Sequence, residues 1–263
     1  MQRTRLLPLQ GGRNFRDLGG YLAHDGRRVR WGRLFRSGVM SYLTDSDHAH
    51  LDAIGLRVVC DLRTQRERER EPTHWRPQEV AWMQWDYDPG QTSLRSYLDG
   101  ESEFTPEVTR QCMLRLYRAL PSLFAPQYAQ LLQRLAAADL PLVFHCSAGK
   151  DRTGLAAALV LSALDVPVET IMEDYRLTDE LVDLEAALFQ HPRSSIGVGD
   201  EYSVLSRVDR AARMPLLRAA PEYLETALEQ IAREHGSIES YLSGPLGLTT
   251  DARDALRAQL LED

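Results

Sequence analysis

The chain has 263 residues, of which 43% are hydrophobic and 26% charged, a composition typical of a globular protein that can bury a sizeable core. Its formal net charge at pH 7 is -7, so the protein has no overall positive field to attract nucleic acid or an anionic membrane surface. We therefore expect no nucleic-acid partner.

The chain contains no predicted targeting or membrane segment. Its N-terminus lacks an apolar run long enough for a signal peptide, and the longest apolar stretch, residues 155–164, is too short to span a bilayer. The cysteines, Cys60, Cys112 and Cys146, are too scattered for a disulfide framework and form no CxxC pair of the kind that binds zinc. We expect a cytoplasmic protein without an integral membrane segment. The oligomeric state is left open.

The first half of the chain contains two predicted strands and one predicted helix. Residues 31–37 (WGRLFRS) are expected to be extended, and residues 56–62 (LRVVCDL) form a β-branched apolar run with the length of a buried strand. Strands of a parallel sheet show this pattern because both of their faces are covered. Leucines and a tyrosine then recur with the spacing of one helix face, which predicts a helix over 127–139.

A third predicted strand leads directly into a loop and a buried helix. Pro141 follows the helix at 127–139, and the apolar residues 142–144 continue the chain as a strand. Residues 153–166 are rich in Ala and Leu and almost free of polar side chains, which predicts a helix buried on most sides. Strand, tight loop and helix therefore meet at Cys146.

The rest of the chain is predicted to be helical, over 168–176, 179–190, 221–234 and 250–262, with a loop at 191–202. No repeat, low-complexity tract or linker divides the sequence, so residues 1–263 are expected to form a single domain. The predicted fold is α/β, with a central, mostly parallel sheet flanked by helices. The helical region at about 178–235 is a candidate for a lid inserted over the carboxyl edge of that sheet.

Residues 145–154 (HCSAGKDRTG) place a cysteine and an arginine six positions apart where a strand becomes a helix. The backbone N–H groups of such a loop can surround a tetrahedral oxyanion, and the helix N-terminus adds its positive dipole end. The same field favours the thiolate of Cys146 and makes it a nucleophile. The planar fork of Arg152 can hold two phosphate oxygens. Cys146 and Arg152 are therefore predicted to be catalytic.

The other residues of this loop are predicted to bind phosphate or to support the loop. Gly149 permits a tight backbone, and Thr153 can donate its hydroxyl to the Cys146 sulfur. His145 is expected to be a packed support rather than a base. The predicted phosphate-binding set is Ser147, Ala148, Gly149, Lys150, Asp151 and Arg152.

Lys150 is the only lysine among the 31 Lys and Arg residues of the chain. A lysine ammonium is compact and rotatable, whereas an arginine guanidinium is larger and rigid. A crowded anion site can therefore accept the one and exclude the other, which indicates a role for Lys150 in anion binding.

This loop resembles the signature Cys-x5-Arg loop of the protein tyrosine phosphatase superfamily. Its expanded form, HCxxGKDRTG, is similar to the loop of the atypical bacterial tyrosine phosphatases, which in turn resembles that of phosphoinositide phosphatases. The resemblance covers nearly the whole chain and is weakest at about 75–125 and 180–220. Its further motifs are NFRDLGG at 14–20, RLFRSG at 33–38, DLRT at 61–64 with Glu67, DY at 174–175 and LGLT at 246–249.

The resemblance implies a cysteine-phosphatase fold and a metal-independent enzyme without cofactor. Such an enzyme hydrolyses phosphate monoesters through a phosphocysteine intermediate. Its expected substrate is a phosphotyrosine-containing protein, with dual specificity as an extension. The alternative substrate is a phosphoinositide, because Lys150 could engage a second phosphate on an inositol ring.

The general acid has two sets of candidates. In most of the superfamily an Asp on a separate loop protonates the leaving group, which here indicates Asp86 or Asp88. In the branch that this chain resembles, the role falls to the loop aspartate, Asp151. We favour Asp151, because a bound phosphate dianion and the Cys146 thiolate would keep it protonated, although Lys150 and Arg152 oppose this.

Several other polar residues are expected to be structural. Asn14, Arg16 and Asp17 either lie near the site or fix the N-terminal strand, and Arg63 is expected to form a structural pair with Glu67. Cys60 is expected to be a buried core thiol, and a redox partnership with Cys146 is less favoured.

Other functional classes lack their defining residues. The GKDRTG pattern and the Cys-to-Arg spacing argue against a rhodanese-like sulfurtransferase. A P-loop NTPase needs GxxxxGK followed by Ser or Thr, whereas Phe144 occupies the first glycine position and Asp151 follows Lys150. A non-catalytic phosphate-binding module is the remote alternative, and it would be indicated by the loss of Cys146 or Arg152, both of which are present.

Overall fold

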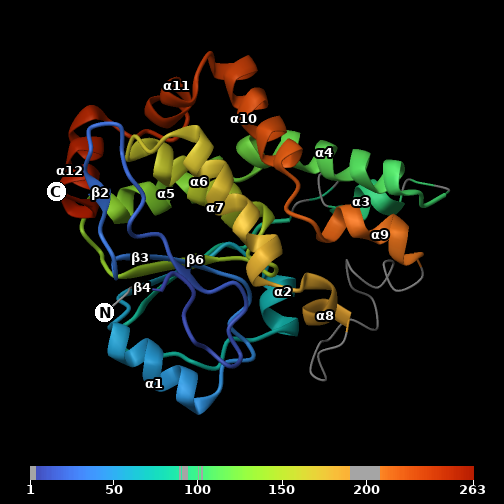
Figure 1. Ribbon diagram of the computed structural model, residues 1–263, viewed down its shortest axis with the longest axis horizontal. Coiled ribbons are helices and arrows are strands. Elements are labelled where there is room, and N and C mark those ends of the chain that lie inside the picture. The colour runs from blue at the N-terminus through green and yellow to red at the C-terminus, as the bar shows by residue number, and fades with distance from the viewer. Residues whose placement is uncertain (1–3, 89, 91–93, 100, 102, 190–207) are drawn as a thin grey trace.

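A five-stranded sheet in the order β1-β3-β6-β4-β5 lies at the centre of the protein (Figure 1). The computed structural model describes residues 4–88, 90, 94–99, 101, 103–189 and 208–263. β3, β6, β4 and β5 are parallel neighbours, and β1 pairs antiparallel with β3. The strands are β1 (Arg16–Asp17), β3 (Leu34–Ser37), β4 (Val58–Asp61), β5 (Ala81–Gln84) and β6 (Leu142–His145). A separate two-stranded sheet joins β2 (Arg28–Val29) to β7 (Leu261–Glu262).

Helices cover both faces of the central sheet (Figure 1). On one face lies α1, which begins with a capping box between Thr44 and Asp47 and ends at Gly55 in the left-handed conformation. The opposite face carries the larger helical layer, which includes α4, α5 and α6. The helices are α1 (Asp45–Ile54), α2 (Gln65–Arg70), α3 (Leu94–Asp99), α4 (Pro106–Leu123), α5 (Ala125–Ala136), α6 (Asp151–Ala163), α7 (Val168–Leu181), α8 (Leu184–Phe189), α9 (Arg210–Leu217), α10 (Pro221–His235), α11 (Ile238–Ser243) and α12 (Thr250–Leu260).

Alternate residues of the parallel strands supply the two cores. Val59 of β4 and Val143 of β6 pair directly and face the smaller core, under α1. Cys60 and Phe144 form the next pair and face the larger core, with the helices of the other layer. This two-residue alternation explains why every position of these central strands is buried and apolar until their carboxyl ends are reached.

The loop that follows β6 emerges at the carboxyl edge of the sheet, between β3 and β4. His145, the last residue of β6, pairs across with Ser37 of β3 and Asp61 of β4. Ligands of open parallel sheets bind at this edge, where strands end and helices begin. The helix that follows, α6, is buried along most of its length by apolar residues, as predicted, so its N-terminus is fixed at the loop.

The predicted α/β fold with a mostly parallel sheet flanked by helices is confirmed, and the bounds of several predicted helices need correction. The helix expected at 127–139 is α5, which ends at Ala136. The helix expected at 179–190 is divided, because α7 continues to Leu181 and α8 begins only at Leu184, with the Asp183 side chain accepting a hydrogen bond from the Ala186 N–H. The helix expected at 250–262 ends at Leu260, because the next two residues pair with β2. The loop predicted at 191–202 lies outside the described residues.

A buried ion cluster ties α7 to the N-terminal strands. Asp174 of α7 pairs with Arg16 of β1 at 3.1 Å and with Arg36 of β3 at 2.5 Å, and all three side chains are inaccessible to solvent or nearly so. Burial alone would raise the pKa of Asp174, but the two guanidinium groups outweigh it and hold the pKa below its usual range. The carboxylate is therefore charged in the folded protein, and the stability that it contributes is lost as the pH falls below the usual carboxyl range.

The substitution Asp174→Asn is expected to lower the free energy of unfolding by about 3–5 kcal/mol, because it leaves two buried guanidinium groups without their counter-charge. Asp25→Asn is the matched control, since Asp25 pairs with Arg27 and Arg257 at the surface, where ion pairs contribute little. Urea unfolding of both variants at neutral pH measures the difference. Equal losses in the two variants would contradict the structural role assigned to Asp174.

Candidate active site

The loop from Cys146 to Arg152 is held on both sides by the neighbouring strands. The Val39 N–H donates to the Ser147 carbonyl at 2.9 Å, and the Leu62 N–H donates to the His145 carbonyl at 2.8 Å. Cys146 follows β6 immediately, and its side chain is buried. The nucleophile predicted from the sequence is therefore fixed between β3 and β4, at the start of the turn that leads into α6.

Gly149 occupies a position that other residues could not adopt without strain. Its φ is +68°, and a Cβ atom there would lie 2.6 Å from the backbone nitrogen of Gly38. Its carbonyl oxygen accepts hydrogen bonds from the Asn14 amide at 2.9 Å and from the Arg36 guanidinium at 2.8 Å. Asn14 thus contacts the loop, and its Oδ1 also accepts a hydrogen bond from Arg16 of β1, so contacts of both kinds considered for it are present. The buried ion cluster reaches the loop through Arg36.

Arg152 is held by a carboxylate from the other side of the site. Its NH1 and NH2 groups donate to the two oxygens of Glu67, at 2.7 and 2.6 Å, and NH1 also contacts the Tyr87 hydroxyl at 3.1 Å. Within the described part of the chain, the Nε–H of Arg152 makes no hydrogen bond. Glu67 fixes the NH1 and NH2 groups, so the Nε–H is the donor of Arg152 that is predicted to bind a phosphate oxygen.

The expected pair of Arg63 with Glu67 is wrong. Arg63 instead binds both oxygens of the buried Asp61, at 2.8 Å each. Glu67 lies in the first turn of α2. Its side chain accepts hydrogen bonds from the Thr64 N–H at 2.7 Å and from the Ser147 hydroxyl at 2.6 Å, and it forms an ion pair with Arg152. The sequence could not distinguish these partners, because Asp61 and Glu67 are both close to Arg63 along the chain.

The environment of Glu67 keeps it charged. Burial alone would raise its pKa, but the Arg152 guanidinium, together with the Ser147 hydroxyl, outweighs burial and lowers the pKa to about 2. A charged Glu67 raises the pKa of Arg152 in turn, against the effect of burial. The loop thus contains an arginine that stays charged and is held in place by a carboxylate of the protein.

Asp151 and the pair Asp86 and Asp88 lie in very different surroundings. The side chain of Asp151, at the first position of α6, is 20% exposed, and its Oδ1 accepts a hydrogen bond from Tyr117 at 2.7 Å. The side chain of Asp86 is 75% exposed and pairs with Arg68 at 2.6 Å, and Asp88 is also exposed. Of the residues in that segment, Tyr87 is the one that contacts Arg152.

Lys150 is buried, with an exposed fraction of 1%. Its ammonium donates to the carbonyl oxygens of Leu216, at 2.5 Å, and Arg218, at 3.3 Å, and lies 3.4 Å from the Oδ1 of Asp151. These carbonyl groups belong to the C-terminal end of α9. In this conformation the lone lysine therefore links the loop to α9.

The two supporting residues predicted from the sequence are both fully buried. His145 lies with Nδ1 3.3 Å from the Cys146 carbonyl and Nε2 3.6 Å from Asp61, and burial lowers its pKa to about 4, so it is neutral at physiological pH. The hydroxyl of Thr153 has no hydrogen-bond partner in the described part of the chain, so the expected bond to the Cys146 sulfur is not formed in this conformation. Burial also raises the pKa of the Cys60 thiol, which lies in the larger core.

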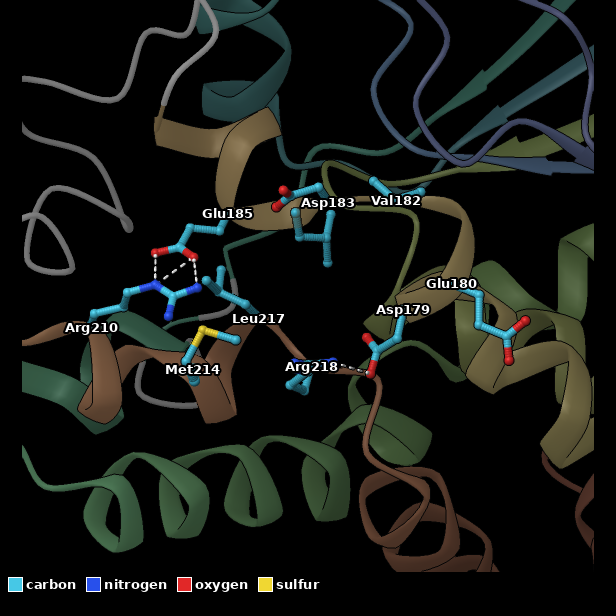
Figure 2. Close-up of a pocket in the computed structure, with 10 residues that line it drawn as sticks. Asp179, Glu180, Val182, Asp183, Glu185, Arg210, Met214, Leu217 and Arg218 are labelled. Atoms are coloured by element: carbon cyan, nitrogen blue, oxygen red, sulfur yellow. Dashed lines mark hydrogen bonds and ion pairs between the residues drawn. The ribbon is translucent and has the colours of Figure 1, made fainter.

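Two short helices cover the loop. Leu184 of α8 and Leu217 of α9 form a small apolar cluster with Ala148. Next to this cluster is a pocket of about 330 Å³, which Figure 2 shows between the end of α7, α8 and α9. An ion pair of Glu185 with Arg210 closes one side of it. Cys146 and Ala148 are both buried. In the described part of the chain, α8 and α9 therefore cover the predicted phosphate-binding loop.

Sequence reasoning missed Glu67, Tyr87 and Tyr117 as members of the site. Tyr87 and Tyr117 fall in the region where the resemblance is weakest, and neither has a local pattern that separates it from a core aromatic residue. For Glu67 a signal existed, because it was part of the resemblance to the family, but its partner was assigned wrongly.

Comparison with known proteins agrees with this geometry. A model of a tyrosine phosphatase family matches residues 7–262. The chain belongs to this family. The structure and this match confirm the resemblance and the predicted cysteine-phosphatase fold, and they identify the chain as a protein tyrosine phosphatase.

Three relatives of this phosphatase have bacterial sources. A protein of Cupriavidus necator named as a tyrosine-protein phosphatase is 32% identical over 89% of this chain and 81% of its own length. The triple specificity protein phosphatase PtpB of Mycobacterium tuberculosis is 30% identical over 96% of this chain and 98% of its own length. A tyrosine-protein phosphatase of Nostoc commune is 31% identical over 54% of this chain and 47% of its own length.

The described residues meet neither the requirements for a membrane-spanning helix nor those for a metal site. None of the described helices has the length and apolar character required to cross a membrane. Nowhere in the described ranges do three or more His, Cys, Asp or Glu side chains gather as ligands for a metal ion.

The contact with Arg152 predicts that Glu67→Gln lowers kcat/KM for phosphate monoesters by about 10-fold or more, because the fork of Arg152 loses its charged anchor. Glu69→Gln is the matched control, since Glu69 is exposed on the same helix and contacts Gln65. Steady-state kinetics of both variants, with thermal unfolding to check the fold, measure the effect. An unchanged kcat/KM in a folded Glu67→Gln variant would show that Arg152 needs no anchor.

Proposed function

We propose that the phosphatase transfers the phosphoryl group of its substrate to Cys146 and then to water, with the roles of the site residues as follows. The observation that carries this proposal is the folded Cys-x5-Arg loop at the carboxyl end of β6, with Arg152 already oriented by Glu67. The presence of both Cys146 and Arg152 argues against a non-catalytic phosphate-binding module.

In the first step the Cys146 sulfur attacks phosphorus in line with the leaving oxygen. The S–P bond forms as the P–O bond breaks, and the leaving oxygen takes a proton from Asp151. The phosphate oxygens lie against the backbone N–H groups of the loop, at the N-terminus of α6, and against the Nε edge of Arg152. Because charge on these oxygens is greatest in the transition state, the fixed donors stabilise that state most.

In the second step water replaces the cysteine. Asp151, now a carboxylate, accepts a proton from the attacking water as the O–P bond forms and the S–P bond breaks. The sulfur leaves as a thiolate, stabilised by the same loop and helix N-terminus. Neither step needs a metal ion or a cofactor, because Arg152 and the backbone donors supply the positive field.

Asp151 is proposed as the general acid in preference to Asp86 and Asp88. Asp151 opens α6 directly after the phosphate loop and is partly buried, with one oxygen held by Tyr117. Asp86 is exposed and forms an ion pair with Arg68. These two observations support a structural role for Asp86 in the surface turn. Tyr87, between Asp86 and Asp88, contacts Arg152. This contact supports the proposal that the segment forms one wall of the site.

Residues 1–263 are proposed to form one domain, in which about 178–235 act as a lid. The contacts of Leu184 and Leu217 with Ala148 support this, because a substrate must displace them to reach the buried Cys146. The bonds from Lys150 to the end of α9 would break in the same movement. We further propose that the protein works in the cytoplasm.

The proposed substrate is a phosphotyrosine-containing protein, with dual specificity toward phosphoserine. The name of the Mycobacterium tuberculosis relative, a triple specificity phosphatase, supports breadth of this kind. A phosphoinositide is the alternative, and it needs Lys150 to turn from the carbonyl groups of α9 toward a second phosphate. Because Lys150 is engaged and buried in this conformation, the geometry favours the protein substrate.

The assignment of Cys146 as the nucleophile is tested by substitution. Cys146→Ser is expected to abolish turnover of a phosphotyrosine peptide while phosphate still binds, because the loop donors are unchanged. The wild-type enzyme is expected to keep its activity in EDTA. One wild-type preparation should also be given a phosphotyrosine peptide, a phosphoserine peptide and a phosphoinositide, and kcat/KM compared. Residual turnover by Cys146→Ser, or a faster phosphoinositide reaction, would overturn the mechanism or the substrate class respectively.

The choice of acid predicts a dependence on the leaving group. Asp151→Asn is expected to slow a phosphotyrosine peptide by about 100-fold, because its phenolate needs a proton, and to slow an activated aryl phosphate far less. Asp86→Asn and Asp88→Asn are the matched controls and should leave both substrates nearly unchanged. If either control reproduced the selective loss and Asp151→Asn did not, the acid would lie on the surface turn instead.

A further inference from the structure

A buried tyrosine touches the proposed general acid. The hydroxyl of Tyr117, on α4, lies 2.7 Å from the Oδ1 of Asp151 and 2.6 Å from the hydroxyl of Tyr175, on α7. Both tyrosine rings are almost inaccessible to solvent and meet edge to face. A chain of hydrogen bonds thus links α7, α4 and the carboxyl group at the start of α6.

The direction of these hydrogen bonds follows from the number of protons. Burial raises the pKa of Tyr117 and of Tyr175 well above the usual value, so both hydroxyl groups keep their protons. The Tyr117 hydroxyl donates its single proton to Oδ1 of Asp151. Tyr175 must then be the donor to Tyr117, which makes a directed chain that ends on the carboxylate.

The charged and polar groups around Asp151 leave its other oxygen open. Lys150 lies 3.4 Å from Oδ1, the same oxygen that Tyr117 binds, while its ammonium donates to the carbonyl groups of α9. Tyr223 of α10 packs on the Tyr117 ring, but its hydroxyl donates to the Pro215 carbonyl. In the described residues Oδ2 makes no hydrogen bond, so it is the oxygen that can carry a proton toward the substrate.

We propose that Tyr117 is the positioning residue of the general acid, fixing Oδ1 of Asp151 so that Oδ2 faces the leaving group. The proposal rests on the assignment of Asp151 made above. When Oδ2 gives its proton to the leaving oxygen and the P–O bond breaks, Asp151 becomes a carboxylate, and the hydrogen bond from Tyr117 becomes charge-assisted. Tyr117 keeps its own proton throughout and stabilises the charge that forms on Asp151. Tyr175 donates a hydrogen bond to the Tyr117 hydroxyl and so holds it in place.

The experiment compares kcat/KM over a series of aryl phosphates, from activated nitrophenyl esters to phenyl phosphate. Tyr117→Phe is expected to reduce kcat/KM for phenyl phosphate by about 10-fold, the effect of one hydrogen bond to a charged group. For the most activated ester the loss should be less than about 3-fold, because that leaving group needs little protonation. Tyr223→Phe is the matched control, since it removes a buried hydroxyl from the same aromatic cluster without touching Asp151.

A double variant tests whether Tyr117 acts through Asp151. On an Asp151→Asn background, Tyr117→Phe should change the phenyl phosphate rate by less than about 2-fold, because residues that act as a unit are not additive. A uniform loss across the ester series, or the full loss on the Asp151→Asn background, would overturn the positioning role. Should Tyr117→Phe fail to fold, Tyr175→Phe must show the selective loss in weaker form, and a uniform loss there would overturn the proposal.

The outcomes separate this proposal from the proposed function. A selective loss in Asp151→Asn together with a uniform or absent effect in Tyr117→Phe leaves Asp151 as the acid and removes Tyr117 from its role. A uniform effect in Asp151→Asn itself overturns the choice of acid, and the role of Tyr117 with it, while the roles of Cys146 and Arg152 stand.

Discussion

The charged carboxylate of Asp174 is the constraint on which the site geometry depends. It lies between Arg16 and Arg36 in an interior from which water is excluded, where an unpaired charge would be costly. Arg36 in turn holds the carbonyl oxygen of Gly149, in the turn between Cys146 and Arg152 that requires a glycine. An ion pair between a sheet and a helix therefore fixes the backbone of the loop that we propose binds phosphate.

A second carboxylate, that of Glu67, lies on the other side of the loop. Glu67 satisfies three groups at once: the start of its own helix, the Ser147 hydroxyl and the Arg152 fork. Because a partly buried carboxylate with these partners stays ionised, the guanidinium is held in place before substrate binds. The site is thus preorganised by the buried Asp174 and the partly buried Glu67, neither of which needs to touch the substrate.

The covering helices give the site a second property. The apolar contacts of α8 and α9 with Ala148 cover the loop, in which Cys146 and Lys150 are almost inaccessible to solvent, and electrostatic interactions are stronger in such an interior. The link between Lys150 and the carbonyl groups at the end of α9 joins this cover to the loop itself. Lys150, the lone lysine of the chain, therefore lies in the loop and also contacts the helix that covers it.

The sequence by itself determined the α/β class and the buried strands at β4 and β6, and it predicted which loop binds phosphate. These features are local: a run of apolar residues, a helix period, and a Cys and Arg within one turn. It could not determine which side chains meet that loop, because Glu67 is 85 residues from Arg152 and Tyr117 is 34 residues from Asp151. Only the tertiary structure brought them together, since packing of α2 and α4 around the end of the sheet, rather than any local periodicity, decides which polar groups share a buried site.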